Sequence, residues 1–339
     1  MQGGAPDAPL LVGIFTWPTR EGARRRELIR QLMPLSEHVD RRFVMADGGN
    51  EYSVEASDMW TWRLPYMARA HVRQIGKFSL SNIFLQHAAT LNHHFVLRTD
   101  DDALFNASAV AAQLIQLPQT MTHLVYGVSR EWYMWNRAAM EPSCYAWSLR
   151  RWEISQQRAH SGAENGTAEC QPAYIGPYLF TKGFFVGYSI ALVRDMVALP
   201  AYSMDQDAVL SNWSGALHER RRSSGGTTGV RRRELLEDVY YSALIYEAWQ
   251  ASPLWFVQVG MSEYNPSRPP AGKLRPAIVY HRLKSRRHLN ASGLLSARGT
   301  EMLRPWKGLP PEPKCKSLAQ AYKRRNDLMH CCRQWVVCD

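Results

Sequence analysis

Apolar residues along the chain follow two different spacings, which alternate from one segment to the next. Residues 9–17 form a short continuous apolar run, PLLVGIFTW, which is typical of a buried strand. In residues 20–33 the apolar positions Leu28, Ile29 and Leu32 share one helical face, and arginines occupy the others. The beginning of the chain therefore predicts a strand followed by an amphipathic helix.

The same alternation continues along most of the chain. We expect strands over 41–49, 93–99, 122–129, 254–260 and 277–283, helices over 77–92, 106–117 and 234–250, and a strand followed by a helix within 182–199. Asn106 or Ser108 is expected to cap the helix of 106–117. Residues 132–180 are dense in Trp and Tyr and are predicted to be irregular. Strand and helix in alternation predict an α/β fold with a mostly parallel central sheet flanked by helices.

The predicted elements define one domain with a tail at each end. The 339 residues, of which 45% are hydrophobic, can bury a large core. We expect an N-terminal tail over 1–8, a folded domain over 9–306 and a Pro- and Cys-rich C-terminal tail over 307–339.

The chain is basic, with 41 Lys and Arg against 30 Asp and Glu and a formal net charge of +11. Much of the excess lies in an Arg-rich loop over 214–233, which is either a solvated loop or a binding segment for anionic glycans or other polyanions. No motif for nucleic-acid recognition accompanies the charge, so nucleic acid is not an expected partner.

Glycosylation signals and cysteines favour the secretory lumen. Asn106, Asn165, Asn212 and Asn290 begin Asn-x-Ser/Thr sequons, and the number of cysteines, 6, is even. No stretch of 18 apolar residues occurs, and the first residues lack the pattern of a signal peptide. We therefore expect membrane association only through an anchor that this sequence does not contain.

Three adjacent carboxylates, Asp100, Asp101 and Asp102, directly follow the strand of 93–99. Ligands bind at the carboxyl ends of parallel strands in open α/β sheets, and repulsion among carboxylates is relieved by a hard divalent cation such as Mn²⁺ or Mg²⁺. An acidic turn in front of the next helix would also explain the three residues, because the helix dipole favours negative charge there. The sequence leaves both interpretations open.

Two further positions carry candidate chemistry. Glu237 and Asp238 begin an otherwise apolar helix, where a partly desolvated carboxylate can act as a general base, although acidic pairs are also common at helix starts. His281 ends a late strand and is either a structural histidine or a ligand.

Five segments in order, LLVGIFTWPTREGARRRELIRQL, FVLRTDDDALFN, GYSIALVRDM, EDVYYSALI and IVYHRLK, give the chain a family resemblance over about residues 9–285. It resembles the β-1,3-galactosyltransferase family (glycosyltransferase family 31), which includes β-1,3-N-acetylglucosaminyltransferases and, more distantly, the Fringe enzymes. The resemblance implies a GT-A fold over 9–306 and an inverting, Mn²⁺-dependent transfer of galactose or N-acetylglucosamine from a UDP-sugar to a glycan or glycoprotein hydroxyl in β-1,3 linkage. It also implies residence in the Golgi.

The resemblance assigns roles to individual residues. It implies that Asp102 and His281 ligate Mn²⁺, with Mg²⁺ as an alternative, and that Asp238 is the base. It further implies that four residues hold the metal shell and the sugar nucleotide: Asp100, Asp101, Arg26 and Arg30.

Two departures from the family pattern leave the transferred sugar and its acceptor open. The segment TKGFFVGYSIALVRD lacks the Gly-rich, Cys-containing form usual before the Arg-Asp pair, and the Arg-rich loop is not part of the pattern. The alternative function is a catalytically inactive glycan- or polyanion-binding protein on the same scaffold. A phosphotransferase or hydrolase is disfavoured, because no phosphate-binding Gly-rich loop with Lys occurs.

Overall fold

The structure is a computed structural model of the chain. It describes residues 9–33, 36–47, 49, 52, 56–64, 77–117, 121–136, 141–146, 174–181, 183–199, 202, 240–242, 244–245, 248, 254–258, 261–263, 279–281 and 335–337. Four helices have defined bounds: α1 (Arg20–Leu32), α3 (Lys77–Ala89), α4 (Ala107–Ile115) and α6 (Ile190–Ala198).

The strands fall into two sheets. The large sheet contains β1 (Leu10–Phe15), β2 (Val39–Ala46), β3 (Met59–Trp62), β4 (Phe95–Asp100), β6 (His123–Asn136), β7 (Glu141–Ala146), β8 (Tyr174–Thr181), β9 (Phe185–Ser189), β10 (Leu254–Gln258) and β13 (Trp335–Val337). The small sheet contains β5 (Leu104–Phe105), β11 (Met261–Glu263) and β12 (Val279–His281).

The large sheet is mostly parallel, as the sequence predicts. Its strand order is β13-β10-β6-β9-β4-β1-β2-β3, with β7 and β8 paired to β6. β1 is parallel to β2 and β4, β2 to β3, and β10 to β6 and β13. β9 is antiparallel to both of its neighbours, β4 and β6.

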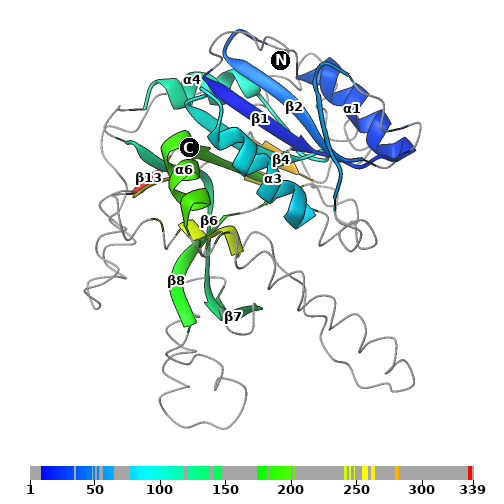
Figure 1. Ribbon diagram of the computed structural model, residues 1–339. Coiled ribbons are helices and arrows are strands. Elements are labelled where there is room, and N and C mark those ends of the chain that lie inside the picture. The colour runs from blue at the N-terminus through cyan, green and yellow to red at the C-terminus, as the bar shows by residue number, and fades with distance from the viewer. Residues whose placement is uncertain are drawn as a thin grey trace, which may run out of the picture.

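Helices cover both faces of this sheet, because the side chains of a strand alternate between its faces. Leu11 and Phe15 of β1 belong to the core shared with α3 and α6, which lie in front of the sheet in Figure 1. Leu10, Val12 and Ile14 belong to the core shared with α1 and α4. β1 is buried along its whole length, which explains its continuous apolar sequence.

A glycine sets how closely α3 approaches β1. A Cβ atom at Gly13 would lie 2.4 Å from the ring of Phe84 in α3, which is closer than side chains pack. The Phe84 ring also meets Phe15 edge-to-face at 5.5 Å. Gly13 therefore allows α3 to lie directly on β1, and this places Lys77, the first residue of α3, near the carboxyl end of the sheet.

Three helices begin with side-chain caps that the sequence supplies. Thr19 accepts a hydrogen bond from the amide of Gly22 at 3.0 Å at the start of α1. Asn106, one of the two expected caps, accepts from Ala109 at 2.9 Å at the start of α4. Ser189 caps α6. These caps satisfy amides that have no partner within the helix.

The small sheet joins two distant parts of the chain. β12 pairs antiparallel with β5, with Tyr280 opposite Leu104 and Val279 opposite Phe105. β11 runs parallel to β12 on its other side. Because β5 follows the three aspartates within two residues, the pairing brings His281 to them.

Parts of the sequence prediction are wrong in detail. Residues 132–180 were expected to be irregular, but β6 extends to Asn136, and β7 and β8 pair antiparallel with it beyond the body of the sheet, as Figure 1 shows. β3 was not predicted at all. The Arg-rich loop over 214–233 lies outside the described residues. Among the residues that the structure describes, no helix has the length and apolar character needed to cross a membrane.

Candidate functional site

The three aspartates emerge where the order of the parallel strands reverses. From β1 the chain proceeds outward through β2 and β3 on one side, and β4 is added on the other side of β1. In the register of β1 and β4, Phe15 lies opposite Asp100. Thr16 and the aspartates therefore leave the sheet together at its carboxyl edge, the position where open α/β sheets bind ligands.

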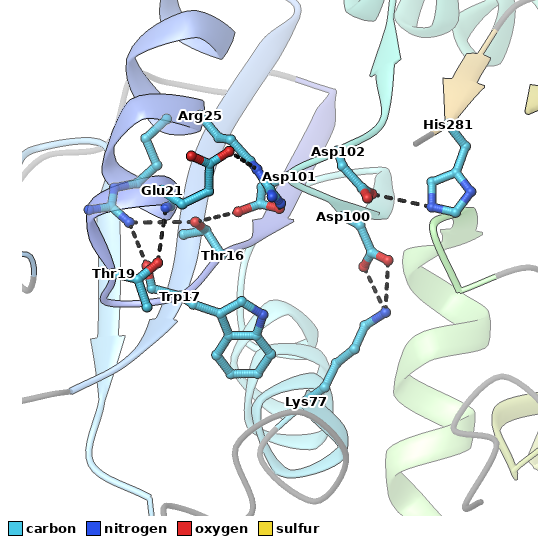
Figure 2. A network of polar contacts seen from close by, with 12 residues as sticks. Thr16, Trp17, Thr19, Glu21, Arg25, Lys77, Asp100, Asp101, Asp102 and His281 are labelled. Carbon is cyan, nitrogen blue, oxygen red and sulfur yellow. Dashed lines mark hydrogen bonds and ion pairs between the residues drawn. The ribbon is translucent and has the colours of Figure 1, made fainter. Parts of the chain in front are cut away.

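Each aspartate has its own basic partner, as Figure 2 shows. Lys77 contacts Asp100, Arg25 contacts Asp101 and His281 contacts Asp102. The partners come from three different elements, α3, α1 and β12. The repulsion expected within the triple-Asp segment is thus relieved by three separate contacts.

Asp101 turns away from its two neighbours, toward β1 and α1. Its carboxylate accepts hydrogen bonds from the Thr16 hydroxyl and from Arg25, both at 2.8 Å, and its amide binds the carbonyl of Phe15 at 3.1 Å. Burial raises the pKa of the Asp101 carboxyl and Asp102 adds to this, while Arg25 and Thr16 oppose the rise. These contacts fix the backbone of the turn and thereby orient the carboxylates on either side.

Asp100, Asp102 and His281 converge on one space. One ligand atom from each lies within 4.8 Å of the other two, and the His281 Nε2 atom is 3.2 Å from Asp102 Oδ1. All three residues are partly buried. Two carboxylates and an imidazole fit a cation such as Mn²⁺, which accepts hard oxygen ligands and tolerates nitrogen.

The imidazole of His281 is held in a defined orientation. It stacks on the ring of Phe184 with centroids 3.9 Å apart and planes 6° apart. Its Nδ1 atom is buried and makes no hydrogen bond with the described residues.

Lys77 forms an ion pair with Asp100. Its ammonium lies 2.7 Å and 2.9 Å from the two carboxylate oxygens. Sequence analysis missed this residue, because only the packing of α3 on β1 brings the two together. Arg25 and Thr16 were also missed, although a polar residue directly after a buried strand is a usable signal for Thr16.

Arg26 organises the loop that follows β1. It is 4% exposed and donates to the carbonyl of Trp17 at 3.0 Å and to the carbonyl of Tyr52 at 2.8 Å. It therefore connects the segment after β1 with a segment after β2. Its expected contact with a nucleotide stays a prediction.

Arg30 lies one helical turn further along α1 and binds elsewhere. Its guanidinium makes two hydrogen bonds of 2.9 Å to the two oxygens of Asp58, which also accepts from Arg41 at 3.2 Å. None of these contacts involves the triple-Asp segment. The nucleotide role implied for Arg30 stays a prediction.

The candidate base, Asp238, and Glu237 lie outside the described residues. Tyr240, two positions later in the sequence, packs on Phe78 with ring centroids 4.9 Å apart. Phe78 directly follows Lys77.

A small pocket lies between α1 and the triple-Asp segment. Arg25, Asp101 and Asp102 form its polar part, and its volume of about 20 Å³ matches a single water molecule. The pocket is too small to hold a nucleotide sugar.

Comparison with known proteins leaves the family open. No family model matches the chain, and no curated protein matches it. The apo structure of mouse xyloside xylosyltransferase 1 is similar over 81% of this chain and 97% of its own, with 12% identity and a TM-score of 0.37. The galactosyltransferase LgtC, solved with donor and acceptor sugar analogues, is similar over 89% of this chain and 98% of its own, with 9% identity and a TM-score of 0.33. These similarities are too weak to assign an activity, which has to be inferred from the chain's own residues.

Proposed function

We propose that this protein is an inverting glycosyltransferase of the GT-A type that uses a UDP-sugar and a divalent cation. The observation that carries the proposal is the convergence of Asp100, Asp102 and His281 at the switch point of a mostly parallel sheet. Nucleotides bind at such points, and a diphosphate supplies the oxygen ligands that a hard cation does not take from the protein.

Asp102 and His281 would hold the cation directly, with Asp100 beside them. Mn²⁺ is the proposed ion and Mg²⁺ the alternative, and when bound the ion neutralises negative charge on the diphosphate of the leaving UDP. Asp101 acts as a positioning residue, because its contacts to Thr16 and Arg25 fix the turn that carries both neighbouring carboxylates. Phe184 orients the imidazole of His281.

Asp238 is the proposed general base. It would take the proton from an acceptor hydroxyl while that oxygen attacks the anomeric carbon on the face opposite UDP. The single displacement converts an α-linked donor into a β-linked product. Support comes from Tyr240, two positions later in the sequence, which packs on Phe78 directly after Lys77, the residue that binds Asp100.

The finer specificity is proposed from the ordered sequence landmarks. They favour the β-1,3-galactosyltransferase family, and so the transfer of galactose or N-acetylglucosamine in β-1,3 linkage to a glycan or glycoprotein acceptor. The same landmarks, with the sequons, favour work in the Golgi lumen.

A thermal-shift titration with UDP, GDP and CMP, each with and without Mn²⁺, tests the donor class, since ligand binding raises the unfolding midpoint. We expect a shift with UDP that requires Mn²⁺. No shift with any nucleotide would overturn the donor proposal and favour the catalytically inactive polyanion-binding alternative.

A substitution at the proposed base tests whether the site is catalytic. Asp238→Asn should leave the UDP-dependent shift nearly intact, while turnover of the UDP-sugar by an acceptor falls by about 1,000-fold or more. An equal loss of binding and turnover would instead assign Asp238 a structural role.

A further inference from the structure

The ammonium of Lys77 occupies a position that a metal ion would compete for. Its two contacts to Asp100, of 2.7 Å and 2.9 Å, span both carboxylate oxygens. Asp100 is at the same time one of the three residues that converge as cation ligands. Lys77 thus holds one ligand of the proposed site by direct ion pairing.

The other charges at the site make this competition effective. Arg25 already compensates Asp101, and Lys77 compensates Asp100. Asp102 faces an imidazole, which is a weaker electrostatic partner than a permanent cation. A divalent cation arriving alone would therefore meet an ammonium that already holds Asp100 and repels the cation.

The backbone of Lys77 is fixed, whereas its side chain has room to move. The next residue, Phe78, is fully buried and packs on Tyr240, and its carbonyl accepts a hydrogen bond from the Tyr241 hydroxyl at 3.5 Å. The side chain of Lys77 is 21% exposed and ends in a flexible four-carbon stem. Movement of this side chain alone can shift its ammonium from Asp100 to another anion close by.

We propose that Lys77 makes cation binding depend on the donor nucleotide. In the free protein its ammonium holds Asp100 and weakens cation binding. When a nucleoside diphosphate binds, the ammonium moves to a diphosphate oxygen and releases Asp100 to the cation. The inference rests on the proposed function in taking a diphosphate as the second anion, and it assigns Lys77 a role in coupling the two ligands.

Calorimetry with Mn²⁺ and no nucleotide tests whether Lys77 weakens cation binding in the free protein. Lys77→Met should bind Mn²⁺ about tenfold more tightly than the unmodified chain, the factor expected for water-screened repulsion between a doubly and a singly charged ion about 6 Å apart. Lys77→Arg, which keeps the charge, should show no such gain. Arg24→Met removes one exposed charge from α1 and should leave the affinity within about twofold.

Affinity for UDP at saturating Mn²⁺ tests whether the Lys77 ammonium binds the diphosphate. Lys77→Met should bind UDP about tenfold more weakly, because the diphosphate loses an ammonium contact. Cation affinity that is unchanged or weaker in Lys77→Met overturns the inference, as does full UDP affinity in that variant. If Lys77→Met does not fold, Lys77→Gln serves as the replacement variant for both titrations.

The two titrations also separate this inference from the proposed function. If the unmodified chain binds no UDP with Mn²⁺, the proposed donor class fails, while the Mn²⁺ titration still tests the competition at Asp100.

Discussion

Two clusters of charged side chains flank α1, and they differ in the ratio of acids to bases. In the Asp58 cluster one carboxylate accepts hydrogen bonds from two guanidiniums, those of Arg30 and Arg41. In the triple-Asp segment three carboxylates each have a separate basic partner, and two of them share a space with His281.

The difference separates a structural cluster from a candidate site. The Asp58 carboxylate accepts hydrogen bonds from arginines that also pack over the ring of Phe43. Its charge is therefore compensated by residues of the chain itself. Asp100 and Asp102 instead each bring a carboxylate oxygen within 4.8 Å of the other and of a ring nitrogen of His281, and Figure 2 shows their separate contacts with Lys77 and His281. Two carboxylates and an imidazole that converge favour a cation, whereas a carboxylate bound by two guanidiniums mainly stabilises the fold.

The largest expected effect comes from removing the charge of Asp102, one of the two carboxylates that converge with His281. Asp102→Asn should weaken Mn²⁺-dependent UDP binding by about 100-fold or more, because the direct ligand loses its charge. The free energy of unfolding should change by less than about 1 kcal/mol, since a repulsive neighbour of Asp101 is also removed. Calorimetry and urea unfolding measure the two quantities. Metal-dependent binding that survives in Asp102→Asn would contradict its role as a ligand.

The second effect should be on stability alone. Asp58→Asn weakens charge-assisted hydrogen bonds to Arg30 and Arg41, and we expect a loss of about 2 kcal/mol in the free energy of unfolding. Affinity for Mn²⁺ and UDP should stay within about twofold, which urea unfolding and calorimetry check together. A large loss of UDP affinity would show that Arg30 acts on the nucleotide after all.

A smaller effect is expected behind the site, at Phe184. Phe184→Leu keeps an apolar side chain but removes the stacked ring, so the imidazole of His281 is held less firmly and Mn²⁺ affinity should fall about fivefold. The control is a double-mutant cycle in which the same change is made in His281→Ala, where its effect should vanish. An equal effect in both backgrounds would mean that Phe184 does not act through His281.

The smallest effect concerns pH. Burial raises the pKa of Asp58, but the hydrogen bonds and charges of Arg30 and Arg41 outweigh it, so the pKa lies below its usual value. Both guanidiniums stay protonated, although burial lowers the pKa of Arg41. The stabilisation from Asp58 is thus complete above the unfolded pKa of about 4 and is lost as pH falls through the lower folded value.

Urea unfolding of the unmodified chain and of Asp58→Asn between about pH 6 and pH 2.5 measures this dependence. The stability difference between them should shrink toward low pH by up to about 1 kcal/mol. A difference that grows on acidification would have the wrong sign for a depressed pKa.

Local sequence patterns predict most of the described elements in the first half of the chain. The apolar run before Thr16 predicts β1, and Asn106 predicts the start of α4, and both are observed. β3 could not be predicted, because its four residues are only partly buried and lie at the edge of the sheet. The pairing of β7 and β8 with the end of β6 was missed because aromatic, turn-rich sequences favour no single element.

The sequence by itself determined that a buried strand ends in three carboxylates and that a later strand ends in His281, because both patterns are local. Only the tertiary structure decided how these residues are used. Lys77 reaches Asp100 because Gly13 allows α3 to lie on β1, and His281 reaches Asp102 because β12 pairs with β5. Contacts between residues far apart in the chain depend on packing and strand pairing, and no local pattern encodes them.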